Sequence, residues 1–422
     1  MLGVVGLVGA VLSSVPALEL SKLPDDGALA ALVWERATDL QLERVRLAQA
    51  KGDADRAHLL PNPGLDVSLN TIPLGTTNPP GLSFGEVPNV AIGLSEQVEL
   101  FKRGPRQAAT GAALTAEVQV ARDLVRQRWL DLLDGIAEIA TAQARTAELT
   151  ELVKDAAELT RLQVERAKLG DTAALDADRA ALEEEKLRAQ LATEQSRLQQ
   201  ALAQCAVLAG VPCHAFESAA LASAYLERRW ALAGAELEQR PDLEALRAQE
   251  ASARAAVSLA NAHAIPDPTL RVGYVRDQFV VSGNQQNSLF VGVSLPLTFF
   301  DRGQTDAAAY ERSALAAASA RALGLEQAKA QLSAVQAQRA TAEARRVTMA
   351  QQSLPTANRL VDRLEAAVQR GAAPVQDLIF ARRSLGELTL DARDLDLFTF
   401  RLAQAEVRLR GLVPPMPQEL SP

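Results

Sequence analysis

Apolar residues recur along much of the chain at the spacing of a helix that packs on one side. In the segment 105–169 they are separated alternately by four and three positions, at Val125, Trp129, Leu132, Ile136 and Ile139. This heptad spacing puts the side chains in one stripe, as in helices that pack closely on other helices. We expect Trp129 to fill the core of that packing. A helix of about 65 residues would be roughly 95–100 Å long at 1.5 Å per residue, which is longer than one globular domain needs.

Four shorter segments alternate for the most part between apolar and small or polar residues. Their apolar positions are Leu65, Val67 and Leu69, then Val90, Ile92 and Leu94, then Leu270, Val272 and Tyr274, and finally Leu289, Val291, Val293 and Leu295. This period of two predicts strands with one apolar face. Such a face meets a core in a soluble sheet and lipid in a membrane barrel, and the strands alone leave both possibilities open. The stretches 73–87 and 282–287 are rich in turn-forming residues, which predicts surface loops.

The same set of elements occurs twice along the chain. Four residues are matched 201 positions later by identical ones: Gly170, Asp176, Ala180 and Gly210 by Gly371, Asp377, Ala381 and Gly411. At offsets of 205 and 199, Leu60-Pro61-Asn62-Pro63 is matched by Ile265-Pro266-Asp267-Pro268, and Phe101-Lys102-Arg103-Gly104 by Phe300-Asp301-Arg302-Gly303. The chain therefore contains two copies of one unit of about 200 residues, and loop insertions account for the small differences in offset.

Each copy is predicted to contain a short helix, a β-hairpin, a long helix and a return helix. The short helices cover about 28–60 and 241–264, and a proline-containing segment ends each of them. The long helices cover 105–169 and 304–369. In each copy the short and return helices together match the long helix in length, so they can stack end to end beside it.

Glycine marks both turns between a long helix and its return helix. Gly170 and Gly371 suit the left-handed residue that often follows a helix. The first return helix covers about 172–209, and Asp171 or Thr172 can cap its start. Pro374 suits the first turn of the second return helix.

These patterns divide the chain into five parts. We predict a signal peptide at 1–17, a first repeat at 18–211, a connector at 212–240, a second repeat at 241–413 and a C-terminal tail at 414–422. The apolar start is too short to span a bilayer, and Val15-Pro16-Ala17 suits cleavage by signal peptidase. The alternative is a buried N-terminal segment. No later stretch holds about 20 consecutive apolar residues, so this chain could span a membrane only as a closed β-barrel.

Composition narrows the possible functions. Aromatic residues make up only 4% of the chain, which is low for an enzyme core of this length, and a net charge of −8 argues against a nucleic-acid partner. The sequence shows no phosphate-binding loop, catalytic triad or paired carboxylates on a suitable scaffold, so we expect neither an enzyme nor a cofactor.

The possible metal ligands are few, and the two cysteines lie close together. Three His, three Met and two Cys are too scattered to chelate a metal as a set. In an exported protein Cys205 and Cys213 can form a local disulfide. The alternative is a metal site that includes His214, for which the sequence offers too few ligands.

The two repeats resemble those of the TolC-type outer-membrane efflux proteins. The likeness is carried by the paired Pro-x-Pro segments before the strands, by the Gly-x5-Asp-x3-Ala pattern at both turns, and by Arg240-Pro241-Asp242-Leu243. The resemblance implies a mixed but mostly α fold, with a long antiparallel coiled-coil α-barrel and four β-strands per subunit. In a homotrimer those strands would form a twelve-stranded transmembrane β-barrel. Trimerisation would remove the open sheet edges, which lipid does not tolerate.

The family also implies a location, partners and a function. The chain would lie in the cell outer membrane with a long periplasmic extension. It would conduct cargo passively from an inner-membrane pump of the resistance-nodulation-division type and a periplasmic adaptor to the exterior. The alternatives are the outer-membrane channel of a type I protein secretion system and a periplasmic coiled-coil structural protein without a barrel.

Two segments look like the heavy-metal branch of this family. They are Leu94-Ser95-Glu96-Gln97-Val98-Glu99-Leu100 with Lys102-Arg103-Gly104, and Leu354-Pro355 ahead of the second turn. In that branch the resemblance implies that the pump selects the ion and the channel does not. Pro355 is also expected to kink the second long helix.

The two helical turns are the candidate site for contact with the adaptor. The residues predicted there are Gly170, Asp171, Thr172, Asp176, Arg370, Gly371, Ala372 and Asp377. Helix-turn chemistry alone also accounts for the glycines, and for Asp176 and Asp377 we favour a role at a helix N-terminus. We expect 183–185, a run of three Glu, to be a solvated helix face. Tyr274 and Phe290 are expected in an aromatic belt at the membrane interface.

Overall fold

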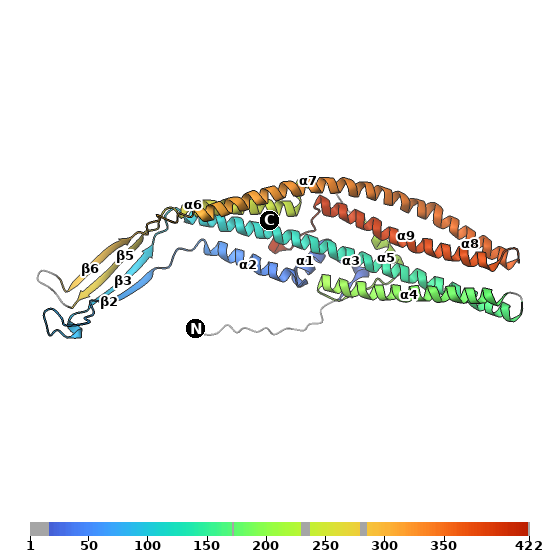
Figure 1. Cartoon of the computed structure of the whole chain (residues 1–422), viewed down its shortest axis with the longest axis horizontal. Helices are drawn as coiled ribbons and strands as arrows, with labels where there is room; N and C mark the ends of the chain where they lie inside the picture. Colours follow the sequence, from blue (N-terminus) through green and yellow to red (C-terminus); the bar gives the residue numbers. More distant parts are fainter. Residues whose placement is uncertain (1–16, 171–172, 229–236, 279–284, 421–422) are drawn as a thin grey trace. The chain divides into compact units, whose positions relative to one another are not determined.

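The computed structural model describes residues 17–170, 173–228, 237–278 and 285–420 (Figure 1). The predicted signal peptide therefore lies, apart from Ala17, outside the described residues. The strands are β1 (Leu18–Glu19), β2 (Gly64–Asn70), β3 (Asn89–Gln97), β4 (Cys213–His214), β5 (Thr269–Asp277) and β6 (Asn287–Ser294). The helices are α1 (Asp26–Arg36), α2 (Leu40–Arg56), α3 (Arg103–Lys168), α4 (Ala174–Ala209), α5 (Ala219–Leu226), α6 (Pro241–Ala262), α7 (Gln304–Thr348), α8 (Leu354–Gln369) and α9 (Val375–Arg410). A π-helical turn occupies Met349–Ser353, and short 3-10 turns lie at Leu20–Lys22, Phe84–Glu86, Leu237–Gln239 and Gln418–Leu420.

The four predicted strands and the first long helix are confirmed. The strands form one antiparallel sheet in the order β2-β3-β5-β6. Helix α3 has 66 residues, close to the length predicted from the heptad spacing. The repeat is also visible in the strand register, because Leu65 pairs with Leu94 and their counterparts Leu270 and Val293 pair with each other.

The chain divides into two compact units, and each unit contains parts of both repeats. One unit comprises 1–44, 120–243 and 323–422, and the other comprises 45–119 and 244–322. The first, which we call the helical unit, contains the return helices and both helical turns; the second, the sheet unit, contains the four-stranded sheet. In the described part of the chain, no helix is both long enough and apolar enough to cross a membrane.

The core of the helical unit forms around α3. The stripe predicted from the heptad spacing is buried, with Val125 at 0% and Trp129 at 1% exposure. The indole N–H of Trp129 donates a hydrogen bond of 3.3 Å to Oδ1 of Asp26, because a buried indole still needs an acceptor. The prediction that Trp129 fills the core is confirmed.

Both return helices end at a glycine that lies against another part of the chain. Gly210 and Gly411 have φ values of +69° and +72°, which glycine adopts without strain. A Cβ on Gly210 would lie 2.6 Å from the carbonyl oxygen of Arg36, and one on Gly411 would lie 2.8 Å from the Cα of Arg240. Arg36 and Arg240 come shortly before α2 and α6.

The first short helix, predicted as one element at 28–60, is two helices, α1 and α2. Helix α1 ends at Arg36, and Ala37 then takes an extended conformation with φ −64° and ψ 124°. Asp39, between the helices, forms an ion pair with Arg128 of α3. Short polar side chains favour helix ends over helix interiors, and the spacing of apolar residues does not carry that information.

The second long helix, predicted over 304–369 with a kink at Pro355, contains a π-helical turn just before its proline. A π-helical turn at Met349–Ser353 separates α7 from α8, and Pro355 lies in the first turn of α8. Proline lacks an N–H, and its ring clashes with the carbonyl four residues earlier. A wider turn accommodates both defects. Pro374, predicted in the first turn of α9, is instead its N-cap.

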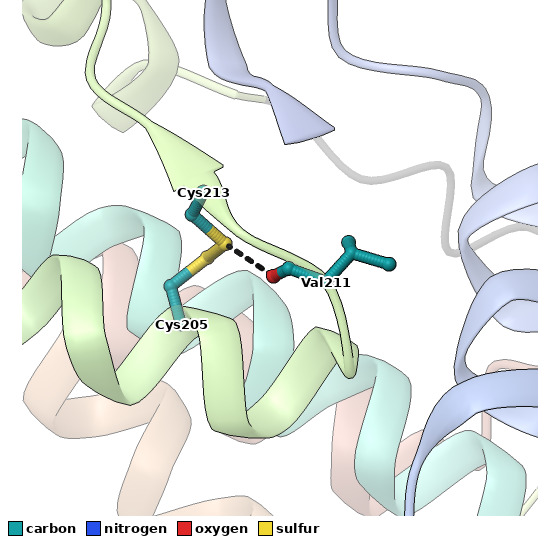
Figure 2. Close-up of a disulfide and its surroundings, with 3 residues drawn as sticks. All are labelled: Cys205, Val211 and Cys213. Atoms are coloured by element: carbon teal, nitrogen blue, oxygen red, sulfur yellow. Dashed lines mark hydrogen bonds between the residues drawn. A yellow bond between two sulfur atoms is a disulfide. The ribbon is translucent and has the colours of Figure 1, made fainter. Parts of the chain in front are cut away.

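A disulfide bond fastens the end of α4 to the strand that follows. Cys205 and Cys213 are separated by 8 positions, and their Cα atoms lie 6.0 Å apart. Figure 2 shows the bond beside the Val211 carbonyl, which lies 3.9 Å from Sγ of Cys213. Strand β4, which contains Cys213, pairs in parallel with β1. The alternative of a metal site at these cysteines is wrong because the disulfide uses both thiols.

Candidate functional site

The turn between α8 and α9 is built on a left-handed glycine. Gly371 has φ +70°, and its N–H donates to the carbonyl of Val368 at 3.0 Å. The N–H of Ala372 donates to the carbonyl of Ala367 at 2.8 Å. These two bonds form a Schellman motif, which satisfies carbonyls that have no partner inside the helix. Arg370 is the last residue before this glycine, and its side chain is exposed.

The turn between α3 and α4 begins in the same way. Gly170 has φ +80°, and its N–H donates to the carbonyl of Ala167 at 3.1 Å. Within the described chain, nothing lies within 4 Å of the place that a Cβ would take on Gly170 or Gly371. Backbone conformation, and not crowding, therefore requires glycine at both turns. Asp171 and Thr172, predicted to cap α4, lie outside the described residues.

The two acidic residues of the candidate site lie at the starts of the return helices. Asp176 is in the first turn of α4, and Asp377 is in the first turn of α9. A carboxylate there interacts favourably with the positive end of the helix dipole. This placement agrees with the role at a helix N-terminus that we favour for both residues.

Side chains link the two return helices near these starts. Nη1 of Arg179 donates to Oδ1 of Asp176 at 3.4 Å and to Oε1 of Gln376 at 3.3 Å. Further along, Nε of Arg383 lies 3.8 Å from Oε1 of Glu183. The structure thus brings the two predicted turns to the same end of the helical unit (Figure 1). Exposed ion pairs contribute about 0–1 kcal/mol each, so these contacts position the turns more than they stabilise the fold.

The run of three Glu at 183–185 is not the solvated face that was predicted. Glu184 is only 9% exposed and pairs with Arg188, while Glu183 is half-buried beside Arg383. Of the three, Glu185 alone is exposed. Helix α9 contacts this side of α4, and a local run of charge gives no information about such a neighbour.

Next to the turns, the helices enclose a mostly apolar cleft of about 120 Å³. Residues of α3, α4, α8 and α9 line it, among them Leu152, Leu159, Leu187, Val361, Ile379 and Leu390. Arg382 and Glu365 also line it, and Nε of Arg382 donates to Oε1 of Glu365 at 3.1 Å.

The sheet provides the second part of the candidate site. Paired residues on neighbouring strands project from the same face. The pairs Val67 with Ile92, Ile92 with Tyr274 and Tyr274 with Leu289 therefore place the apolar positions of all four strands on one face. Apart from the half-buried Val90, this face is open, with exposures from 41% at Tyr274 to 82% at Val291. A contiguous apolar surface of this kind marks a site of contact with lipid or another protein.

Tyr274 and Phe290 do not belong to one aromatic belt. Phe290 pairs with Gly273, and Gly273 pairs with Gly93, so Phe290 lies on the face opposite Tyr274. Its ring covers both glycines, because a Cβ on Gly273 would lie 2.5 Å from Cε1 of Phe290 and one on Gly93 would lie 3.0 Å from Cζ. The predicted belt is wrong for this pair, because successive residues of a strand face opposite sides and Phe290 lies between Leu289 and Val291.

A buried ion pair, missed in the sequence, joins the two repeats at the base of the sheet. Nζ of Lys102 lies 2.8 Å from Oδ2 of Asp267, and the two side chains are 11% and 8% exposed. Asp267 also accepts hydrogen bonds from the Leu100 N–H at 2.9 Å and from the Gln97 amide at 3.3 Å. Burial alone would raise the pKa of Asp267, but these donors outweigh it and hold the pKa below its ordinary value of 3.8. Both residues lie in recognisable motifs, yet no local pattern pairs them.

The described residues hold no group of three or more His, Cys, Asp or Glu arranged to bind a metal ion. The turns and the sheet offer surfaces for contact, together with an acidic residue at the start of each return helix.

Comparison with known proteins relates this arrangement to one family. The family model for outer membrane efflux proteins matches residues 232–413. Among solved structures, CusC is 16% identical, with 94% of this chain and 96% of CusC covered and a TM-score of 0.72. The outer membrane protein VceC of Vibrio cholerae is 18% identical, with 91% and 95% covered and a TM-score of 0.72. The MtrE outer membrane channel of Neisseria gonorrhoeae, in its open state, is 16% identical, with 96% and 95% covered and a TM-score of 0.69. No curated protein matches the chain.

The fold is that of a TolC-type channel, mostly helical with an antiparallel sheet. The second repeat carries the sequence pattern of the outer membrane efflux protein family, so the resemblance drawn from the motifs is confirmed. The predicted location, the outer membrane with a periplasmic extension, is that of the family matched. The matched proteins are channels and not enzymes.

Proposed function

We propose that this protein is the outer-membrane exit duct of a tripartite efflux pump. The sheet carries the proposal, because it has four strands, an exposed apolar face and two open edges at β2 and β6. Four strands do not close a barrel, and the unpaired backbone groups of an open edge are not tolerated in lipid. Three copies of the chain supply twelve strands, which close the barrel with the apolar face toward lipid and the polar face toward water.

The two helical turns are the proposed contact with a periplasmic adaptor. The contact residues are Gly170, Asp171, Thr172, Asp176, Arg370, Gly371, Ala372 and Asp377. Their support is that both turns lie at one end of the helical unit and that Gly170, Arg370, Gly371, Ala372 and Asp377 are exposed. An inner-membrane pump of the resistance-nodulation-division type would deliver the cargo, and the duct would conduct it passively without binding nucleic acid or a cofactor.

The proposed cargo is a metal cation or a small toxic compound. The likeness of the segments around Glu96 and Pro355 to the heavy-metal branch supports the first of these. In this proposal the pump selects the cargo, because the duct needs no chelating cluster to pass an ion. The identity of the neighbouring pump gene separates the two cargo classes.

Conductance tests the proposal directly. We expect the full chain, reconstituted in planar lipid bilayers, to give discrete conductance steps from an oligomer whose migration changes on heating. A water-soluble monomer without conductance contradicts the proposal and leaves a periplasmic coiled-coil protein. Export of a protein substrate, with no export of small cargo, assigns the chain to type I secretion instead.

Gly371→Pro tests the adaptor contact separately from assembly. Proline fixes φ near −65°, whereas Gly371 has φ +70° and uses its N–H in the turn. We expect Gly371→Pro to abolish efflux in cells and to leave trimers intact on a denaturing gel without heating. Gly371→Asn is the control, since asparagine tolerates the left-handed region, and it should retain efflux. Loss of trimers in Gly371→Pro would place the fault in folding.

A further inference from the structure

The two edge strands of the sheet, β2 and β6, are the repeat counterparts of the two strands that pair at its centre. The central junction joins β3 of the first repeat to β5 of the second. By the offset of 199, β6 is the counterpart of β3, and by the offset of 205, β2 is the counterpart of β5. A β6 edge and a β2 edge therefore carry the same kinds of strand as the central junction.

The two hairpins show that this correspondence holds residue by residue. Val67 pairs with Ile92 in the first hairpin. Their counterparts, Val272 and Val291, pair in the second hairpin. Because the hairpins share one register, the register of the central junction can be transferred to the edges.

The central junction has a strand pair and a polar contact that fix its register. Gly93 of β3 pairs with Gly273 of β5. Beyond the strands, Lys102 follows β3 and forms the buried ion pair with Asp267, which precedes β5. The counterpart of Lys102 is Asp301, after β6, and the counterpart of Asp267 is Asn62, before β2.

We propose that a second copy of this chain docks its β2 against β6 in the register of the central junction. Gly292 then pairs with Ser68 of the neighbouring copy, and the carboxylate of Asp301 accepts a hydrogen bond from the amide of the neighbour's Asn62. This inference rests on the proposed function, because closure by copies of the chain is part of it.

The side chains at the edges fit this register. It places Val291 opposite Leu69 and Val293 opposite Val67, so the apolar face continues without a break across the junction. A shift of one position would turn apolar side chains to the polar face. A shift of two positions keeps the faces but separates Asp301 from Asn62, so the polar contact selects between the remaining registers.

The chemistry of the base contact also fits, although donor and acceptor are exchanged. In the central junction the residue before the strand, Asp267, accepts and the residue after the other strand, Lys102, donates. At the edge the residue before the strand, Asn62, donates and the residue after the strand, Asp301, accepts. Asn62 and Asp301 are both exposed in the single chain, whereas their counterparts are buried.

The exchange also disfavours incorrect assembly. If β6 of another copy took the place of β3 beside β5, Asp301 would lie opposite Asp267, and two carboxylates would repel each other in a buried place. If β2 took the place of β5 beside β3, Lys102 would meet Asn62 and lose its ion pair. The four residues therefore distinguish the correct neighbour of each strand from the incorrect one.

Disulfide cross-linking of Ser68→Cys with Gly292→Cys, in one full-length chain, tests the register. Paired residues on antiparallel strands have Cα atoms about 4.5–5.5 Å apart, within the range of a disulfide. The native cysteines do not interfere, because both are in the disulfide. After mild oxidation of isolated outer membranes, heated samples on a denaturing, non-reducing gel should show dimers and trimers that reducing agent removes. Each single variant should remain monomeric on the same gel.

Asn70→Cys with Gly292→Cys is the control for a shifted register. Asn70 lies on the same face but two positions along, about 7 Å from Ser68, so its cross-link should be at least several-fold weaker. A stronger cross-link at position 70, or none at position 68 in a conducting channel, overturns the inference and leaves the proposed function intact. Absence of both oligomer and conductance refutes the proposed function itself.

A charge exchange tests the base contact. Asn62→Asp alone places two carboxylates together at the junction, and should lower the temperature at which the oligomer dissociates on a denaturing gel. Adding Asp301→Lys recreates at the edge the ion pair of the central junction, and should return that temperature at least to the wild-type value. If the double variant dissociates at the same temperature as Asn62→Asp, the contact between these residues is refuted.

Discussion

Two valines of this chain show that regular stripes of apolar residues can be buried in one region and exposed in another. Val125 in α3 is completely buried, whereas Val291 in β6 is 82% exposed. Both belong to regular apolar stripes, and burial of a valine stabilises a fold by roughly 1.5–3 kcal/mol. The stripe on α3 gains this stabilisation from other helices of its own chain. The apolar stripe on the sheet is exposed in the single chain, so lipid or another molecule must bury it.

The comparison teaches that periodicity predicts which face of a helix or strand will be buried, but not which segment or molecule will bury it. Heptad spacing placed Trp129 in a core, and alternation placed Val291 on an apolar face, with equal success. Whether a helix of the same chain or a membrane buries that face depends on residues far away in the sequence. The following substitutions test the two regions, beginning with the largest expected effect.

Trp129→Ala tests the region that the chain covers itself. Removing this side chain leaves a cavity and loses a hydrogen bond to Asp26, and we expect the free energy of unfolding to fall by about 3–5 kcal/mol. Denaturant unfolding followed by the helical circular dichroism signal measures it. Lys154→Ala, an exposed position on the same helix, should change stability by no more than about 0.5 kcal/mol. A loss below about 1 kcal/mol for Trp129→Ala would mean that the α3 stripe is not the core.

Lys102→Met tests the polar contact between the repeats. It leaves the buried Asp267 without its cation, and breaking such a pair costs about 3 kcal/mol. Adding Asp267→Asn, which removes the unpaired buried carboxylate, should recover most of the lost stability at pH 7. Unfolding of each variant in denaturant measures both effects.

The same pair should make stability depend on pH in one direction. Because the pKa of Asp267 is lower in the folded chain than its ordinary 3.8, its contribution is complete above that value and is lost as pH falls through the folded-state pKa. The double variant lacks this carboxylate, so its stability should fall less than that of the wild type below pH 3.8. An equal fall in both proteins would show that other carboxylates dominate.

Val67→Arg tests the region that the chain leaves uncovered. An arginine on the lipid face near the middle of a bilayer costs about 2–4 kcal/mol, whereas in water an arginine at this exposed position costs little. We expect several-fold less heat-modifiable oligomer in the outer-membrane fraction. Ala91→Arg, on the opposite face of the inner strand β3, is the control and should assemble nearly normally. Equal assembly of both variants would mean that lipid does not cover the apolar face.

Gly371→Ala should have the smallest effect. A residue with a Cβ is strained by about 1–2 kcal/mol in the left-handed conformation that position 371 adopts, with φ +70°. This strain destabilises only the exposed turn between α8 and α9. We expect faster hydrogen exchange within that turn and no measurable change around Trp129. A loss of protection throughout the helical unit would show that the turn is coupled to the core.

The elements that were predicted well have signals confined to a short stretch of sequence. Alternation located β2, β3, β5 and β6, heptad spacing located α3, and glycine located both turns. The repeat added confidence in each, since the second copy supplied an independent instance of the same pattern. The likeness of the paired motifs to one family then gave the fold as a whole.

The elements that were predicted wrongly depend on contacts between distant residues. Glu184 is buried because another helix packs beside it. Phe290 is an exception, because its position between Leu289 and Val291 already placed it on the face opposite the apolar stripe. Lys102 and Asp267 belong to different repeats, so no local spacing joins them. The break between α1 and α2 had a local signal in Thr38 and Asp39, but it was weaker than the apolar spacing around it.

The disulfide between Cys205 and Cys213 makes part of the fold sensitive to its chemical surroundings. It links β4 to α4, and β4 pairs with β1, which contains the buried Leu18 and is followed by the buried Leu20. Thiols stay reduced in the cytosol and oxidise in compartments outside it. A copy retained in the cytosol would therefore lack the covalent link between α4 and β4, and the pairing of β4 with β1 would depend on backbone hydrogen bonds alone.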